Sequence, residues 1–120
     1  MNVENMQVEY FKEIISQKQG CVLMKFGASW CGPCKKITPY IKNKIDAIHN
    51  KKLQYMDIDI DDNCDIYMYL KRKKLVTKLP TFLLYKGSNK TVDDEEIHIP
   101  DYSVIGIDER ELDIMFKMIE

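Results

Sequence analysis

Residues 21–36 read CVLMKFGASWCGPCKK and decide the fold of the chain. The run from Cys21 to Phe26 is mostly apolar, is too short for an independent helix and is followed by a glycine, which predicts a strand buried on both faces. Isoleucines then recur at helical spacing from residue 37 to residue 48. Pro39 lies within that pattern, so we expect a long helix with a bend. A buried strand that leads into a helix is typical of an α/β sheet.

The rest of the chain continues this alternation of helices and strands. The further predicted elements are a helix over residues 6–15, a strand over 53–60, a helix that carries residues 66–70 and is capped by Asp61 or Asp62, a strand over 81–85, return-strand material within 97–105, and a final helix that begins at a capping box at Asp108. Strands joined through helices run parallel, whereas the last two strands, joined by a turn, run antiparallel. The order therefore predicts a mixed sheet covered by helices on both faces.

Length and charge restrict the class of protein. The chain has 120 residues, 45% of them apolar, and a formal charge of −1, so we expect one domain, residues 1–120, with a folded core. The near-zero charge argues against nucleic acid and anionic membranes as partners. No apolar run approaches a membrane span, the first residues are polar, and four cysteines are too few for a disulfide-dense secreted scaffold. We therefore expect a cytoplasmic location.

The chemistry is expected at Cys31 and Cys34. These cysteines lie where the first buried strand ends and the long helix begins. Free N–H groups and the positive end of the helix dipole stabilise an anion at a helix start, so Cys31 is the candidate nucleophile. The spacing of three brings the two sulfur atoms within bonding reach across the first turn, and Pro33 loses little there by lacking an N–H. Cys34 can therefore close a disulfide with Cys31.

With these residues the chain resembles the thioredoxin family. The sequence from Trp30 to Lys35, WCGPCK, is among the most specific signatures of that family, and Leu79-Pro80-Thr81 matches the place where the family has a cis-proline facing the dithiol. Gly106 matches a family glycine beside the substrate groove. The resemblance covers residues 6–120 and implies the thioredoxin fold, a mixed central sheet of about four to five strands flanked by about four helices.

The resemblance implies protein disulfide reductase activity. Cys31 would attack a substrate disulfide, and Cys34 would resolve the mixed disulfide and leave the pair oxidised. The residues expected to bind the substrate are Trp30, Gly32, Pro33, Leu79, Pro80 and Gly106. No cofactor or metal is expected in the chain itself; the electrons would come from an NADPH-linked flavoprotein of the thioredoxin reductase kind. The expected partners are disulfide-containing proteins and that reductase, and the expected state is a monomer.

Two features depart from the family pattern. Lys25 stands where the family has a buried Asp that exchanges a proton with the second cysteine, so Lys25 is a candidate modulator of the thiol pKa, with Asp57 or Asp59 of the neighbouring strand as a possible partner. About twenty residues follow Gly87 where the family has a tight hairpin, which predicts an extended hairpin region at about residues 87–105. That region would end on the order of 20 Å from the dithiol and would act mainly as a solvated loop.

Several alternatives remain open at this stage. Without the buried Asp, the same fold could serve as a disulfide oxidase or isomerase, or as a non-enzymatic binding subunit. The four cysteines could bind zinc, although Cys21 is more simply a core residue and Cys64 an idle thiol. The basic run at residues 71–74 suits a helix end. His49 and His98 are interpreted as surface residues.

Overall fold

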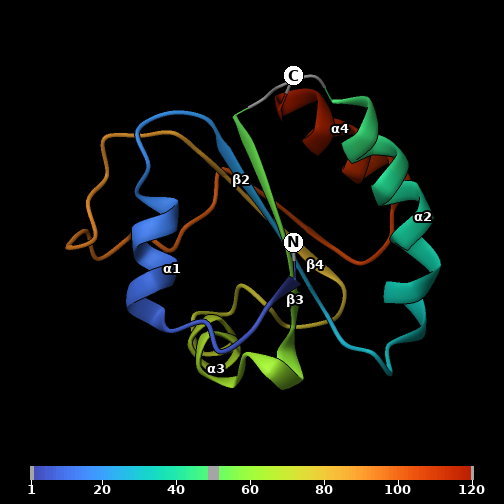
Figure 1. Ribbon diagram of the computed structural model, residues 1–120, viewed down its shortest axis with the longest axis horizontal. Helices are drawn as coiled ribbons and strands as arrows, with labels where there is room; N and C mark the ends of the chain where they lie inside the picture. The colour runs from blue at the N-terminus through green and yellow to red at the C-terminus, as the bar shows by residue number, and fades with distance from the viewer. Residues whose placement is uncertain (1, 49–51, 120) are drawn as a thin grey trace.

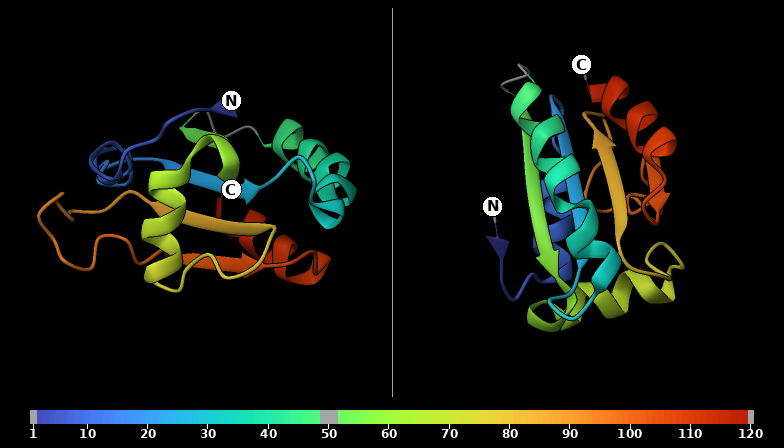
Figure 2. Two further views of the ribbon diagram at one scale, coloured as in Figure 1. Left: turned by 90° about the horizontal axis from the view of Figure 1, so that it is seen from below. Right: turned by 90° about the vertical axis from the view of Figure 1, so that its right-hand side faces the viewer.

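The computed structural model describes residues 2–48 and 52–119 and contains one mixed sheet with helices on both faces (Figures 1 and 2). The strand order is β1-β3-β2-β4-β5. β1 and β2 pair with β3 in parallel, whereas β4 runs antiparallel to both β2 and β5, which confirms the predicted mixed sheet. The strands are β1 (Asn2–Val3), β2 (Cys21–Gly27), β3 (Leu53–Asp59), β4 (Thr81–Lys86) and β5 (Tyr102–Ile105).

The helices lie in two pairs, one on each face of the sheet (Figure 2). They are α1 (Val8–Ile15), α2 (Gly32–Ala47), α3 (Cys64–Arg72) and α4 (Glu109–Ile119), with a short 3₁₀ helix, η1 (Ile60–Asp62). Side chains of β2 alternate between the two resulting cores. Met24 and Phe26 pack with residues of α1 and α3, and Leu23 packs with residues of α2 and α4. Every residue of β2 is buried, as predicted for a central strand.

Two helix starts differ from the prediction. Met6 is buried but precedes α1, which begins at Val8. Asp61 and Asp62 do not cap α3, because they lie inside η1, whose own start is capped by the Asp59 carboxylate through the amide of Asp61. The capping box predicted for the final helix is present in part: the Asp108 carboxylate accepts a hydrogen bond from the Arg110 amide at 2.9 Å, whereas the Glu111 carboxylate accepts from the Tyr102 hydroxyl. α2 remains one helix through Pro39.

Asn63 stands at the N-cap position of α3, but its side chain makes no cap bond there and bonds to distant backbone groups instead. Its side chain is fully buried; the amide oxygen accepts from the Met6 backbone N–H at 2.9 Å, and the amide nitrogen donates to the carbonyl oxygens of Val3 and Asp59 at 2.8 and 2.9 Å. A buried amide that satisfies three backbone groups fixes the segments that carry them. Asn63 therefore ties the N-terminal segment to the β3–α3 connection.

The connection between β4 and β5, residues 87–101, folds back beside α1 (Figure 1). At its start the Gly87 amide donates to the Gly20 carbonyl at 2.8 Å. The chain passes so close to residue 18 that a Cβ on Gly87 would lie 2.5 Å from the carbonyl oxygen of Lys18. Further along, Ile97 is 2% exposed and packs in the core on the α1 and α3 side of the sheet. The predicted return-strand material within residues 97–105 is confirmed for its second half, where β5 covers Tyr102–Ile105, whereas Ile97 lies before the strand and packs in the core.

His98 follows Ile97 and is only partly exposed, so its predicted surface position holds in part. The ring lies edge-on to Tyr69 at 6.2 Å between centroids, and its buried Nδ1 has no hydrogen-bond partner among the described residues. The Tyr85 hydroxyl donates to the His98 carbonyl oxygen at 2.7 Å. Burial, together with nearby Lys73, lowers the pKa of His98. The other histidine, His49, lies outside the described residues.

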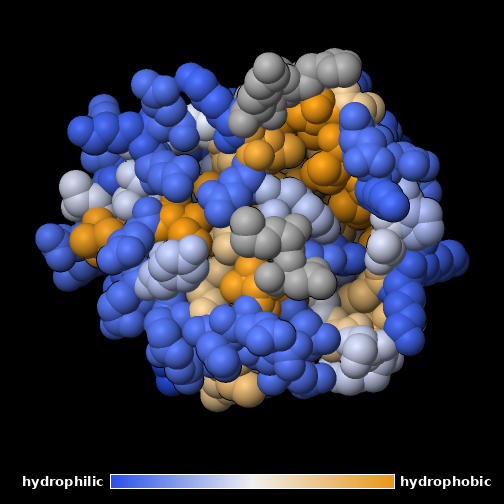
Figure 3. All heavy atoms as spheres, in the orientation of Figure 1, coloured by the Kyte–Doolittle hydropathy of each residue, from blue (hydrophilic) through white to orange (hydrophobic). Residues whose placement is uncertain are grey.

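Hydrophilic side chains cover most of the face seen in Figure 3, with an apolar strip between β3 and α2. A cavity of about 240 Å³ lies between these two elements, where Ile41, Ile45 and Tyr55 contribute the larger apolar groups. Among the described helices none is long and apolar enough to span a bilayer.

Candidate redox site

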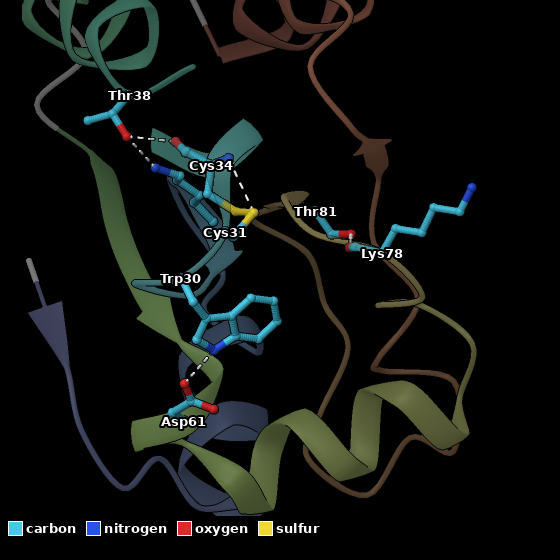
Figure 4. Close-up of a disulfide and its surroundings, with 8 residues drawn as sticks. Trp30, Cys31, Cys34, Thr38, Asp61, Lys78 and Thr81 are labelled. Atoms are coloured by element: carbon cyan, nitrogen blue, oxygen red, sulfur yellow. Dashed lines mark hydrogen bonds between the residues drawn. A yellow bond between two sulfur atoms is a disulfide. The ribbon is translucent and has the colours of Figure 1, made fainter. Parts of the chain in front are cut away.

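The start of α2 carries the predicted cysteine pair, which forms a disulfide (Figure 4). The Cα atoms of Cys31 and Cys34 are 5.3 Å apart. Cys31 is the N-cap of the helix, and its sulfur accepts a hydrogen bond from the Cys34 amide at 3.2 Å. An amide at a helix start directed at a sulfur atom is the arrangement that stabilises a thiolate. The prediction that the two cysteines lie within bonding reach is confirmed.

Trp30 precedes the disulfide and is two-thirds exposed. Its indole Nε1 donates to the Asp61 carboxylate at 2.8 Å (Figure 4). Asp61 lies in η1, whose first turn is held by the Asp59 cap. This hydrogen bond fixes the indole to η1, which directly follows β3. From the sequence, Asp61 was predicted only as a helix cap.

The loop before β4 brings the other predicted residues to the same edge. The Leu79–Pro80 peptide bond is cis, as expected from the resemblance. The Pro80 carbonyl oxygen accepts from the Gly106 amide at 2.8 Å, and Gly106 has a φ of +99°, a backbone conformation that favours glycine. The Thr81 hydroxyl closes the loop by donating to the Lys78 carbonyl oxygen at 2.6 Å (Figure 4).

A groove of about 540 Å³ runs between these two segments. From the predicted set, its walls include Trp30, Cys31, Gly32, Pro33 and Leu79. Pro80 is buried, and Gly106 lies outside the groove, linked to it through the Pro80 carbonyl oxygen.

The remaining wall of the groove was not predicted; it consists of Tyr67, Val76, Thr77 and Lys78. Three of these residues directly precede the Leu79-Pro80 pair, and that position was the available signal. No feature of the sequence marked Tyr67, because it lies in α3 and lines the groove only through the packing of that helix against the loop before Pro80.

The comparisons with known proteins agree with this geometry. The family model described as Thioredoxin matches residues 2–101. The chain belongs to the thioredoxin family. It is 31% identical over 90 residues to Thioredoxin Asp f 29 of Aspergillus fumigatus, covering 74% of this chain and 78% of that protein. The crystal structure of Malassezia sympodialis thioredoxin superposes with a TM-score of 0.74 at 23% identity, covering 98% of this chain and 90% of the other.

A further relative joins two activities in one chain. The Bifunctional thioredoxin reductase/thioredoxin of Mycobacterium leprae is 29% identical over 87 residues, which cover 72% of this chain and 18% of that protein. As a member of the thioredoxin family with its cysteine pair at disulfide distance, the chain is a thiol-disulfide oxidoreductase with protein disulfide reductase activity.

Lys25 is the main departure from the thioredoxin pattern near the cysteines. It is 4% exposed, and its ammonium donates to the Thr38 hydroxyl oxygen at 3.1 Å. That hydroxyl in turn donates to the Cys34 carbonyl oxygen at 2.8 Å (Figure 4). The Thr38 hydroxyl therefore links the Lys25 ammonium to the backbone of Cys34 in the first turn of α2.

Asp57 lies beside Lys25 in the register of β2 and β3. Both residues line a hollow of about 320 Å³, open to the surface, that also contacts Asp59 and Cys34. Within residues 2–48 and 52–119, however, no carboxylate is at salt-bridge distance from the Lys25 ammonium. The expected direct ion pair of Lys25 with Asp57 or Asp59 is thus absent from the described part, and the Thr38 hydroxyl takes its place. Burial, reinforced by the Asp57 carboxylate, raises the pKa of Tyr55, which lies two residues before Asp57.

The two other cysteines of this thioredoxin-family chain are free thiols. Cys21 is buried at the start of β2, and burial raises its pKa. Cys64 is exposed at the start of α3, where its thiol donates to the Asp61 carbonyl oxygen at 3.6 Å. In the part of the chain that the structure describes, no three His, Cys, Asp or Glu side chains converge as metal ligands would.

Proposed function

We propose that Cys31 is the attacking and Cys34 the resolving thiol of this reductase. The observation that carries the assignment is the side of the chain that each cysteine faces. Cys31 lines the groove beside Trp30 and Leu79, whereas Cys34 lines a separate hollow beside Lys25, Asp57 and Asp59. A protein substrate in the groove can therefore meet Cys31, which is part of its wall, and not Cys34, which is not.

The reaction then proceeds in two exchange steps. The Cys31 thiolate attacks one sulfur of a substrate disulfide; the substrate S–S bond breaks, and its second sulfur leaves as a thiolate that takes up a proton. Cys34, after losing its proton, attacks the Cys31 sulfur of the mixed disulfide and releases the remaining substrate thiol. Two electrons have passed to the substrate, and the Cys31–Cys34 disulfide has formed.

In this proposal the substrate binds as an extended segment along the groove. Trp30, Gly32 and Pro33 form one wall, and Leu79 forms part of the other, where its main chain pairs with the substrate. Pro80 and Gly106 support this wall indirectly, because the hydrogen bond from the Gly106 amide to the Pro80 carbonyl oxygen holds the loop that carries Leu79. These residues supply shape and backbone contacts, so many disulfide proteins fit.

Lys25 has a positioning role in the same proposal. Its ammonium approaches the first turn of α2 through Thr38, and a nearby cation favours a thiolate over a thiol. The proton released by Cys34 passes to water or to a carboxylate of Asp57 or Asp59 in the hollow that these residues line with Cys34. A Lys25→Met variant should therefore resolve the mixed disulfide more slowly, with its pH–rate profile displaced to higher pH; an unchanged profile would contradict the role.

The electron donor is proposed to be a separate NADPH-linked flavoprotein. The support is the Mycobacterium leprae relative, in which a thioredoxin reductase and a thioredoxin share one chain. We propose that the chain acts as a monomer in a reducing compartment such as the cytoplasm. An exposed free thiol at Cys64 fits such a compartment, because disulfides form readily in oxidising ones.

The test is a trapping experiment combined with a measured reduction potential. Cys34→Ser should accumulate a mixed disulfide with insulin, because attack continues and resolution does not; Cys31→Ser, the matched control, should trap none. The wild-type chain should reduce insulin with a potential close to that of reducing thioredoxins. A strongly oxidising potential would favour an oxidase or isomerase, and absence of exchange would favour a binding subunit.

A further inference from the structure

The C-terminal part of the connection between β4 and β5, residues 94–101, forms a strap that lies against the core. Ile97 is 2% exposed and packs with core residues on the α1 and α3 side of the sheet. The Tyr85 hydroxyl, whose pKa is raised mainly by burial, stays uncharged and donates to the His98 carbonyl oxygen at 2.7 Å. One apolar side chain and one hydrogen bond from β4 thus hold the strap on either side of the His98 peptide.

The imidazole of His98 lies among groups that suit its neutral form. Its Nδ1 is buried and has no hydrogen-bond partner in the described part of the chain. The ring meets Tyr69 of α3 edge-on, and the ammonium groups of Lys12 and Lys73 lie 5.8 and 5.7 Å from the centre of that tyrosine ring. A neutral imidazole can keep Nδ1 unprotonated there, whereas an imidazolium would bury a charged N–H without an acceptor, near two other cations.

The charged groups around His98 differ in sign between its neighbours and its own segment. Burial of the ring is the largest effect and opposes protonation, and the ammonium groups of Lys73 of α3 and Lys12 of α1 act in the same direction. Within the strap itself, contact with the Glu95 backbone and the Glu96 carboxylate favours the protonated ring. The balance lowers the pKa of His98, which agrees with the packing of the ring.

We propose that the strap is acid-sensitive: protonation of His98 releases residues 94–101 from α1 and α3 while the central sheet stays folded. In the released strap the imidazolium is hydrated, which removes both the unpaired buried N–H and the repulsion by the two lysines. The opening equilibrium should therefore rise as the pH falls below about 6.5, the pKa of an exposed histidine. Release also takes a packing partner from α3, the helix that carries Tyr67 in the groove wall.

Hydrogen exchange followed by mass spectrometry tests the strap in the full chain with its disulfide intact. Exchange rates at pH 7.5 and 5 are divided by the intrinsic rate at each pH, so that only the opening of structure is compared. The amides of Ile97, Ile99 and Asp101 report on the strap, because each donates to a backbone carbonyl oxygen. We expect their protection to stay below that of β2 at both pH values and to fall severalfold at pH 5, with about 30-fold as the upper limit for one histidine.

Variants identify the groups responsible for the release. In His98→Gln the strap should keep the same protection at both pH values, because an amide side chain does not titrate. In the double variant K12M/K73M the fall should become smaller, since the repulsion is lost and the burial of the ring remains. Lys90→Met, an exposed lysine of the same connection outside the strap, is the matched control and should behave as the wild type.

Three outcomes would overturn the acid-sensitive strap. The first is strap protection that does not change between pH 7.5 and 5 in the wild type. The second is an equal fall in His98→Gln, which would assign the pH dependence to other groups. The third is strap protection that coincides with that of β2 at both pH values, because the strap would then open only when the whole chain unfolds.

Discussion

Replacing Ile97 with alanine tests whether the segment of residues 87–101 belongs to the core. The side chain is 2% exposed and packs with the cluster that includes Phe11 and Tyr85. The change removes everything beyond Cβ, which at about 0.8 kcal/mol per buried carbon, with an added term for the cavity, amounts to a loss of about 3 kcal/mol in the free energy of unfolding. For a chain of this size the melting temperature should fall by roughly 10 °C.

The assay is urea unfolding followed by circular dichroism, with Ile99→Ala as the matched control. Ile99 lies two residues further on and is 47% exposed, so its loss should cost no more than about 0.5 kcal/mol. The reductase activity of folded Ile97→Ala should remain normal, because the segment leaves β4 on the order of 20 Å from the disulfide at about 3.3 Å per residue. Equal and small losses for the two variants would refute the assignment of the segment to the core.

Three further results are expected. Gly87→Ala should destabilise the fold by about 2 kcal/mol or more, because the new Cβ meets a main-chain oxygen, whereas Gly32→Ala, which meets nothing within 4 Å, should show no comparable clash; urea midpoints compare them. Since burial lowers the pKa of His98, the unfolded chain takes up a proton first as the pH falls below about 6.5. The wild type should therefore lose stability relative to His98→Gln between pH 7.5 and 5, and a constant difference would count against the lowered pKa of His98. With the redox disulfide intact, a thiol reagent should modify Cys64 in the folded chain and reach Cys21 only after denaturation, as mass spectrometry would show.

Local pattern was sufficient for the central part of the fold. The strand and helix around residues 21–47 follow from a short apolar run and helical spacing, and the cysteine pair follows from its place between them. The strand at Thr81 was equally accessible, because an apolar run marks it locally, whereas the cis bond before Pro80 was expected only from the resemblance to the thioredoxin family.

What the sequence could not indicate depends on contacts between distant segments. Asn63 directly precedes α3, but its side chain makes no cap bond to that helix and bonds instead to residues near the N-terminus. Ile97 fits a strand by composition and is instead used to fill the core beside α1. Tyr67 joins the groove only because α3 is folded against the loop before Pro80. The partners of Asn63 and Ile97 lie several elements away in the sequence, and Tyr67 depends on how the loop that follows its own helix folds back; periodicity carries no information about either.

The position of the segment that follows β4 has a practical consequence. Asn89 is exposed in this segment. It follows the C-terminal end of β4, and the cysteine pair lies near the other end of that strand, where Pro80 precedes Thr81. A dye or a solid support attached at that residue would leave the cysteines facing incoming proteins. A sensor or an immobilised bait could therefore be attached at this position, because the attachment point and the redox site lie at opposite ends of the protein.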